Sequence, residues 1–387
     1  MLSRKKQVLF SLIVLLLLAL LVEGLSYVYV YKLKDNALGA ASERNEYAYF
    51  RGHELNPQYQ REFDTGGRRI HSADGFRRDQ PVSVKKPEGV YRIILFGGSQ
   101  AYGVGSQHGG VYPPEPSLQN NETVSYFLEQ TLNRGLSAAG VDLRVEVINA
   151  AAIAYKVYQH LLYFNERLYQ YDADLLVFLD GHNDFYPGEP NSNPMLTNVY
   201  AKDLVWQFNG RGALFAFYSG ARWLGQYSYF FKLLEKGLQD LLPRVNPYQA
   251  PAVADVSPAD YRLYARDNYL RFYQQFRALA EIYGFSMHLF IQPEILLEDP
   301  ALLSEHDRMI YRISDEYGDR ESKTSIHPQL QGVFADSGLA VTDFTQLAPD
   351  NDKGLDLYFD YTHLTPDGSA LLADNMAQVL LPQIRGM

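Results

Sequence analysis

The chain has 387 residues, a formal net charge of −10 and no cysteine. The negative charge argues against nucleic acid or an anionic lipid surface as the substrate. Without cysteine the chain forms no disulfides, and a chain of this length buries a sufficient core without them.

The N-terminus predicts a single membrane anchor. Basic residues at positions 4–6 precede an apolar run over residues 8–22, and a tyrosine-rich stretch continues it over residues 25–31. The combined run is long enough to cross a bilayer, and because no Ala-x-Ala site follows it, an uncleaved anchor is favoured over a signal peptide. Basic flanks stay in the cytoplasm, so we expect a cytoplasmic tip and transmembrane helix over residues 1–35 and a periplasmic or extracellular remainder. Glu23 either snorkels to the surface or meets an intramembrane partner helix.

We expect residues 36–90 to form an irregular segment, a lead-in to a first strand over residues 91–97. That strand runs directly into the sequence Gly97-Gly98-Ser99. Glycines allow a sharp turn, so the Ser99 hydroxyl and its own N–H can both face a cleft at the carboxyl end of the strand. Ser99 is therefore a candidate nucleophile, although taken alone an ordinary turn residue is the simpler interpretation.

Apolar strands alternate with helical patterns through the rest of the chain. This alternation predicts an α/β domain over residues 91–387, with a parallel sheet covered by helices on both faces. The further strands are expected at residues 144–149, 174–180, 285–291 and 339–343, and the helices at residues 124–138, 155–169, 260–283 and 366–383.

Two more motifs supply what a serine nucleophile lacks. The strand at residues 174–180 ends in Gly181-His182-Asn183-Asp184, where an asparagine amide can stabilise a developing oxyanion. Further on, Asp360 precedes His363 by three residues, just before a helix start. His363 can act as a general base, and Asp360 can hold its ring. A loop or a helix lead-in is the alternative for each motif.

An aromatic-rich insertion over residues 186–258 follows the asparagine motif directly. Rooted there, it can serve as a lid, a substrate platform, or a surface that rests on the membrane or on a partner. A helical cap packed on the core is an equally good interpretation.

Together these motifs resemble the SGNH hydrolases, also called the GDSL esterase and acyltransferase superfamily, over residues 70–387. Its first, third and fifth blocks match residues 97–99, 181–184 and 360–363 in order. The resemblance implies a five-stranded, flavodoxin-like α/β/α sandwich. It also implies Ser99 as nucleophile, His363 as base, Asp360 as orienting acid, and Asn183 as an oxyanion donor beside the Ser99 N–H.

The chain departs from the family pattern at two positions. Gly98 stands where an aspartate is usual, and Ala154 stands where the family carries a glycine whose N–H helps to bind the oxyanion. Alanine still offers that N–H, but it adopts a positive φ less readily than glycine, so we expect a differently shaped or less complete oxyanion hole. If the Ala154 N–H completes the hole, its φ is expected to be one that alanine tolerates.

The resulting hypothesis is an extracytoplasmic serine esterase or O-acyltransferase that forms an acyl-serine intermediate. Its expected substrate is an acyl (acetyl) group on a carbohydrate or cell-envelope polymer, and an envelope-assembly protein is a possible partner. The alternatives are a lipid or small-ester hydrolase and a weakly active polysaccharide-binding or assembly protein of the same fold. The other histidines show no metal-ligand spacing, so neither a metal nor a cofactor is expected.

Overall fold

The computed structural model describes residues 4–29, 45–46, 54–55, 70–106, 117–185, 213–225, 227–245, 258–317, 334 and 337–386. The chain divides into two compact units. One comprises Met1–Glu46 and Tyr200–Ala252, and the other comprises Tyr47–Val199 and Val253–Met387. Much of the predicted lead-in at 36–90 and of the insertion at 186–258 lies outside the described residues.

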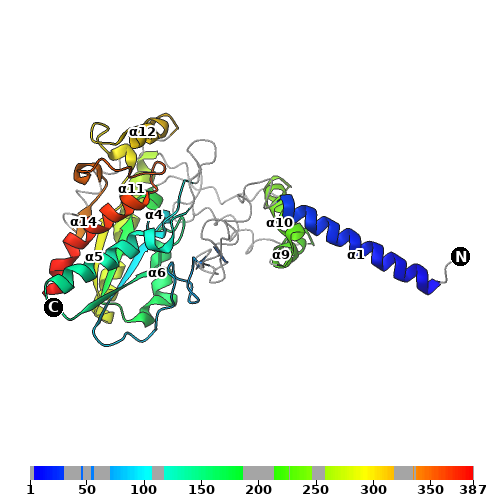
Figure 1. Cartoon of the computed structure of the whole chain (residues 1–387), viewed down its shortest axis with the longest axis horizontal. Coiled ribbons are helices and arrows are strands. Elements are labelled where there is room, and N and C mark those ends of the chain that lie inside the picture. Colours follow the sequence, from blue (N-terminus) through cyan, green and yellow to red (C-terminus); the bar gives the residue numbers. More distant parts are fainter. Residues whose placement is uncertain are drawn as a thin grey trace. The chain divides into compact units, whose positions relative to one another are not determined.

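The larger unit contains the predicted five-stranded parallel sheet, in the order β4-β3-β5-β6-β7 (Figure 1). Strands β3 and β5 are interior strands of this sheet and are buried along their whole length, as their largely apolar sequences predict. Each strand lies within two residues of its predicted position. The strands are β3 (Val90–Gly97), β4 (Arg144–Asn149), β5 (Leu175–Asp180), β6 (Ser286–Ile291) and β7 (Val341–Asp343). The predicted fold class is confirmed.

Helices cover both faces of this sheet. Helices α5 and α14 pack together (Figure 1), whereas α6 packs against α11. Crossovers between parallel strands are right-handed. The chain moves from β3 outward to β4 and then back past β3 to β5 and β6, so the crossover helices α6 and α11 lie on the face opposite α5. The described helices of this unit are α4 (Ser99–Tyr102), α5 (Val124–Ala138), α6 (Val157–Glu166), α7 (His182–Phe185), α11 (Pro258–Tyr283), α12 (Glu305–Tyr317) and α14 (Pro366–Arg385).

The helix expected over residues 155–169 is shorter than predicted. Lys156, with φ −113° and ψ 163°, is still extended, and the helix ends where Arg167 leaves helical geometry. A short 3-10 turn, η3 (Leu168–Tyr171), completes the segment. Tyr155 therefore belongs to the loop between β4 and α6, at the carboxyl edge of the sheet.

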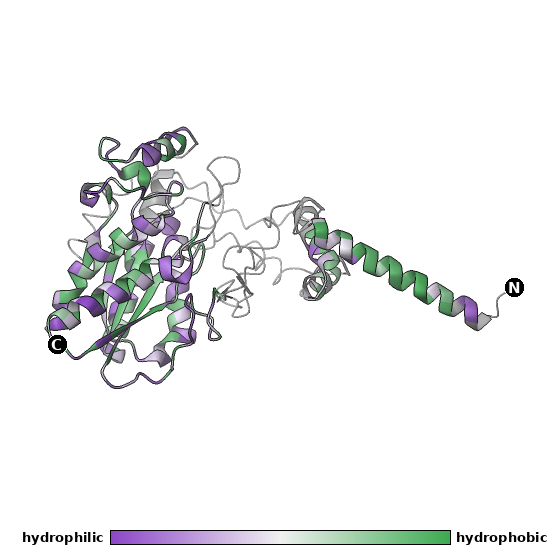
Figure 2. Cartoon of the chain, viewed as in Figure 1, coloured by the Kyte–Doolittle hydropathy of each residue, from purple (hydrophilic) through white to green (hydrophobic). Residues whose placement is uncertain are grey.

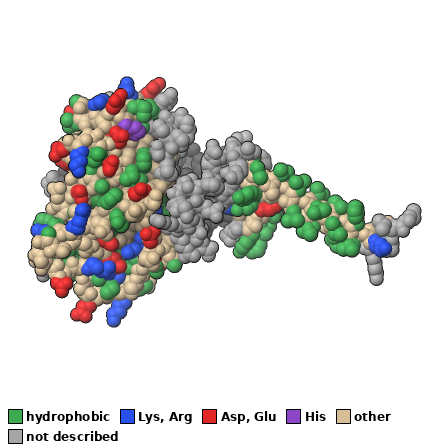
Figure 3. All heavy atoms as spheres, viewed as in Figure 1, with side chains coloured by type: hydrophobic (Ala, Val, Ile, Leu, Met, Phe, Trp, Pro, Cys, Tyr) green, Lys and Arg blue, Asp and Glu red, His purple; other side chains and the backbone are tan. Residues whose placement is uncertain are grey.

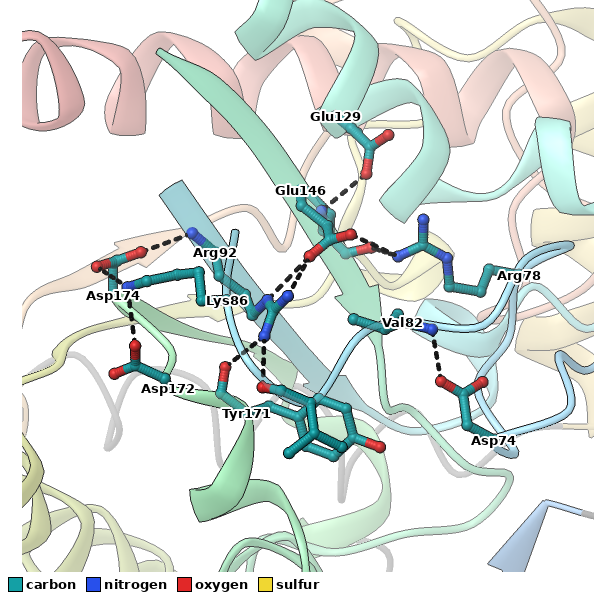
Figure 4. A network of polar contacts seen from close by, with 12 residues as sticks. Asp74, Arg78, Val82, Lys86, Arg92, Glu129, Glu146, Tyr171, Asp172 and Asp174 are labelled. Atoms are coloured by element: carbon teal, nitrogen blue, oxygen red, sulfur yellow. Dashed lines mark hydrogen bonds and ion pairs between the residues drawn. The ribbon is translucent and has the colours of Figure 1, made fainter. Parts of the chain in front are cut away.

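Figure 4 shows a buried ion pair that joins β3 to the edge strand β4. The Arg92 side chain on β3 is fully buried, and its Nε and Nη2 lie 2.9 Å and 2.8 Å from Oε2 of Glu146, its register partner on β4. Nη1 of Arg92 also donates to the carbonyl oxygens of Val84 and Tyr171. The guanidinium thus links the segment before β3 to β4 and to the turn η3, which precedes β5.

The smaller unit contains three described helices, α1 (Arg4–Val28), α9 (Ala213–Leu224) and α10 (Tyr229–Val245). Within α1, residues Leu9–Val28 are long and apolar enough to cross a membrane, a test that a signal sequence also passes. Figure 2 shows α1 as hydrophobic along most of its length. The remaining short elements of the chain are β1 (Asn45–Glu46), β2 (Glu54–Leu55), η2 (Asn120–Glu122), η4 (Ile295–Leu297) and η5 (Ala348–Asp350).

The ion pair gives a stability prediction. Arg92→Met leaves the Glu146 carboxylate buried without its main partner, so we expect it to lower the free energy of unfolding by about 3 kcal/mol or more. Replacing both residues, as Arg92→Met with Glu146→Leu, should recover much of that loss. Urea denaturation of the three proteins followed by circular dichroism measures the effect. A single variant as stable as the parent would contradict it.

Candidate active site

The predicted serine lies at the carboxyl edge of the sheet, where β3 ends. Ser99 is the first residue of the one-turn helix α4, directly after Gly97 and Gly98. A Cβ at Gly97 would collide with the Ala101 side chain and with the carbonyl oxygen of Leu179 on β5. The close approach of these backbones therefore requires glycine at the position where the strand turns into the helix.

The structure brings Ser99, His363 and Asp360 together. Nε2 of His363 lies 2.8 Å from Oγ of Ser99, although the two residues are 264 positions apart in the chain. Nδ1 of the same ring lies 2.8 Å from Oδ2 of Asp360. His363 and Asp360 are buried, whereas Ser99 is partly exposed. These contacts form one chain of hydrogen bonds from a buried carboxylate to an accessible hydroxyl.

The Asp360 carboxylate is fixed by its own loop. Its Oδ1 accepts hydrogen bonds from the backbone N–H groups of Thr362 and His363, at 3.0 Å and 2.9 Å. Burial raises the pKa of Asp360, but the adjacent His363 charge and these hydrogen bonds outweigh burial and hold the pKa below its usual range. The group therefore stays ionised beside the imidazole, as orientation of that ring requires.

Two glutamines fasten the histidine loop to the rest of the edge. Buried Gln100, which follows the serine, donates from Nε2 to the carbonyl oxygens of Pro293 and Thr362. Gln292, at the end of β6, donates to Oγ1 of Thr362 at 3.0 Å. The sequence analysis missed both residues. Gln100 carried one usable signal, its position directly after a candidate nucleophile.

Asn183 occupies the space that an ordinary side chain at position 98 would need. Its Nδ2 donates to the carbonyl oxygen of Tyr155 at 3.0 Å, and a Cβ at Gly98 would collide with that same nitrogen. The departure at Gly98 therefore has a steric reason in this chain. Asn183 sits directly against the residue that precedes the serine.

Ala154 adopts a left-handed conformation with φ 60°. A conformation that alanine tolerates was expected if the Ala154 N–H completes the oxyanion hole, whereas the observed one is the conformation that glycine prefers at such positions. For an L-residue this conformation costs about 1–2 kcal/mol. The backbone at the second block thus keeps a glycine-like conformation although the glycine is absent.

Asp184 also holds the loop that contains Ala154, through a hydrogen bond at the start of α6. Its Oδ1 accepts a hydrogen bond from the backbone N–H of Val157, the first residue of α6, at 3.0 Å. Burial, and next the nearby Asp180 charge, raise the pKa of Asp184 to about 7. Asp180 itself accepts from Tyr273 Oη at 2.7 Å and lies 3.0 Å from Nε2 of His160.

A third histidine–carboxylate pair lies at this edge, after the Asp360–His363 and Asp180–His160 pairs. Nδ1 of His182 lies 2.5 Å from Oε1 of Glu294, and the ring of Tyr361 is 5.3 Å from the His182 ring. The sequence analysis gave His182 no role and did not single out Glu294. Among the described residues, no group of three or more His, Cys, Asp or Glu side chains is arranged to hold a metal ion.

The raised pKa of Asp184 gives a pH prediction. The neutral form is the stable one when buried, so its contribution is complete below the unfolded pKa near 4 and is lost as the pH rises through about 7. Asp184→Asn imitates the neutral form. We expect the variant to match the parent near pH 4 and to exceed its free energy of unfolding by on the order of 4 kcal/mol at pH 8.

Urea denaturation at several pH values measures this difference. Asp142→Asn, at an exposed position, is the matched control and should follow the parent at every pH. Parallel pH curves for the parent and Asp184→Asn would show that Asp184 is ionised throughout this range.

Comparison with known proteins finds no matching family model and no matching curated protein. Matching solved structures include an acetyl xylan esterase, with 13% identity, 75% of this chain and 99% of the other covered, and a TM-score of 0.37. A lipase/acylhydrolase from Enterococcus faecalis has 16% identity, coverage of 76% and 96%, and a TM-score of 0.36. A GDSL-like lipase from Bacteroides thetaiotaomicron has 11% identity, coverage of 78% and 93%, and a TM-score of 0.34. At identities and TM-scores this low, the similarities support no conclusion about activity.

Proposed function

We propose that this protein is a membrane-anchored serine esterase or O-acyltransferase of the SGNH type, with its catalytic domain outside the cytoplasm. The observation that carries the proposal is the hydrogen-bonded series Asp360–His363–Ser99, with Nε2 of His363 2.8 Å from Oγ of Ser99. Ser99 and the Asp360–His363 pair, from two distant parts of the chain, meet in the order that acyl transfer uses.

The geometry supports a two-step reaction. The Ser99 hydroxyl oxygen attacks the ester carbonyl carbon while Nε2 of His363 takes its proton. The bond to the leaving alcohol then breaks, and His363 returns the proton to that alcohol. Asp360, ionised and bonded to Nδ1, stabilises the imidazolium between the two transfers. Water or a second hydroxyl group then attacks the acyl-serine by the same route in reverse, which regenerates Ser99.

The oxyanion is assigned to three donors: the backbone N–H groups of Ser99 and Ala154, and the Asn183 amide. The hydrogen bond from Asn183 to Tyr155 supports this assignment, because it uses only one of the two amide hydrogens and ties Asn183 to the residue after Ala154. Donors fixed in this way need no reorganisation when negative charge develops on the carbonyl oxygen.

The proposed substrate is an O-acyl group, with acetate on an envelope or exported carbohydrate as the leading case. This choice follows from the resemblance to a family with such substrates and from the proposed location beyond the membrane, not from a contact in the site. The apolar helix Leu9–Val28, preceded by basic residues, supports an anchor with its N-terminus in the cytoplasm. An envelope-assembly partner remains part of the proposal.

The mechanism predicts that Ser99→Ala and His363→Ala each lower turnover on the order of a thousand-fold or more, because the members of such a unit fail together. Asp360→Asn should cost as much or less. Release of nitrophenol from an acetyl ester measures turnover, and a serine-reactive fluorophosphonate followed by mass spectrometry identifies the labelled residue. Near-normal turnover by a folded Ser99→Ala protein would refute the mechanism. Glycan binding without turnover by the parent would favour the binding-protein alternative.

The oxyanion assignment predicts a different pattern. Asn183→Ala should lower kcat roughly a hundred-fold with little change in KM, since it removes one donor to the transition state. Ala154→Pro removes the backbone donor and, because proline cannot adopt the observed φ of 60°, also forces the loop out of its conformation, so it should cost at least as much, on the order of a hundred-fold or more. Ala154→Gly relieves the left-handed strain, so its activity should stay within a few-fold and its free energy of unfolding should rise by about 0.5–1 kcal/mol.

Steady-state kinetics with thermal melts of each variant check these expectations. A folded Ala154→Pro protein with parental kcat would show that position 154 donates nothing to the oxyanion. A change confined to KM in Asn183→Ala would make Asn183 a ground-state contact instead.

A further inference from the structure

The smaller unit contains a carboxylate within an apolar helix, and the start of another helix satisfies it. Oε1 of Glu23 on α1 accepts from the backbone N–H of Tyr229, the first residue of α10, at 2.6 Å. Oε2 accepts from the Ser228 hydroxyl at 2.7 Å and from the Phe230 N–H at 3.2 Å. The negative charge therefore lies at the positive end of a 17-residue helix.

The position of Glu23 along α1 sets the depth of this contact in a bilayer that the helix spans. At 1.5 Å per residue, Glu23 lies about 21 Å from Leu9 and about 8 Å before Val28, at the two ends of the apolar stretch. A helix that spans the bilayer over this stretch therefore carries Glu23 near its far boundary. An unpaired carboxylate there is costly, whereas one bonded to three donors is not. Ser26, on the same face of α1, is buried.

Large aromatic side chains are exposed on α9, on α10 and in the turn between them. Trp223 is 60% and Tyr227 is 74% exposed, and their rings lie 5.7 Å apart at the turn between α9 and α10. Phe217 on α9 and Phe230 on α10 are also exposed. On α1, the Tyr27 ring meets Tyr229 edge to face at 5.2 Å.

The inner side of the helix pair is packed in the usual way. Tyr218 and Ala221 of α9 are buried against Leu238 of α10, with Phe231 and Leu234 beside them. The exposed aromatic side chains thus take no part in the packing of α9 against α10. Tryptophan and tyrosine in this position are typical of the boundary between hydrocarbon and headgroups.

We propose that α9 and α10 form a lipid-binding hairpin that lies in the outer boundary of the bilayer, held to the anchor by Glu23. This inference rests on the membrane anchor of the proposed function and not on the esterase chemistry. Trp223, Tyr227 and Phe230 enter the headgroup region. The hairpin thus fixes the segment that follows the asparagine motif to the membrane surface.

Continuity with α1 favours lipid over a protein partner. The apolar side chains of α1 are exposed along the described helix, and Figure 3 shows them covering the face in view. The material that covers these side chains in a membrane is hydrocarbon, and the Glu23 contact places the exposed aromatics of α9 and α10 at the end of that surface. Burial of apolar area is the driving force, so phosphatidylcholine without anionic lipid should suffice.

Tryptophan fluorescence tests the depth of the hairpin in the full chain. Trp223 is one of only two tryptophans, so Trp206→Phe makes it the sole reporter. The protein is assembled into phosphatidylcholine nanodiscs, both faces of which are open to solvent. We expect strong quenching of Trp223 by phosphatidylcholine brominated near the top of its acyl chains, and a several-fold lower quenching constant for aqueous iodide than at a control site. Tyr169→Trp, at an exposed position of the larger unit in a chain lacking both native tryptophans, supplies that control.

Glu23 is tested in the same reporter chain. Glu23→Ala removes all three hydrogen bonds and should raise the iodide quenching of Trp223 towards the control value. Glu23→Gln keeps an acceptor without the charge and should fall between. Glu281→Gln, at an exposed position in the larger unit, should behave as the parent.

The outcomes separate the two proposals. A chain that co-elutes with the discs but exposes Trp223 to iodide, without quenching by brominated lipid, overturns the hairpin and leaves the anchor and the esterase standing. That result would instead favour a protein partner on this surface. A chain that fails to enter the discs overturns both anchor and hairpin. Unchanged quenching in Glu23→Ala would show that Glu23 does not hold the hairpin.

Discussion

The candidate site depends on the burial of β3 between β4 and β5. Both neighbours pair with β3 in parallel, so all three strands end at the same edge of the sheet. The close approach of the Leu179 carbonyl to Gly97 leaves no room for a Cβ, and the chain turns there into α4. The serine therefore stands at the one place where loops after β5, after β6 and before α14 can all reach it.

The carboxylates on the two sides of this edge differ in how their oxygens are satisfied. On the histidine side, the Asp360 carboxylate receives its backbone and ring hydrogen bonds and keeps a low pKa. On the asparagine side, Ala154 is held left-handed, and Asp184 has a buried oxygen without a hydrogen-bond partner. Strain and desolvation thus collect beside the proposed oxyanion donors, a distribution expected where a site is preorganised at a cost in stability.

The sheet and the triad residues were predictable because their signals are local. Apolar runs define the strands, and each motif directly follows a strand or precedes a helix, so topology alone brings them to one edge. Other features arise only when distant loops meet. Asn183 lies where a side chain at position 98 would stand, and Gln100 reaches Thr362. Both contacts join residues that are far apart in the sequence, so no local pattern predicts them. The conformation of Ala154 was misjudged for the same reason, since surrounding contacts override its local preference.

The contrast between Glu23 and Asp184 shows how carboxylates can be used differently in one chain. Each accepts a hydrogen bond from the backbone at the start of a helix, Glu23 from α10 and Asp184 from α6. Glu23 gains three donors and so can remain charged within an apolar segment. Asp184 gains one, and burial, and next the nearby Asp180 charge, raise its pKa. Burial and a like charge therefore favour the neutral acid at Asp184, whereas three donors favour the anion at Glu23.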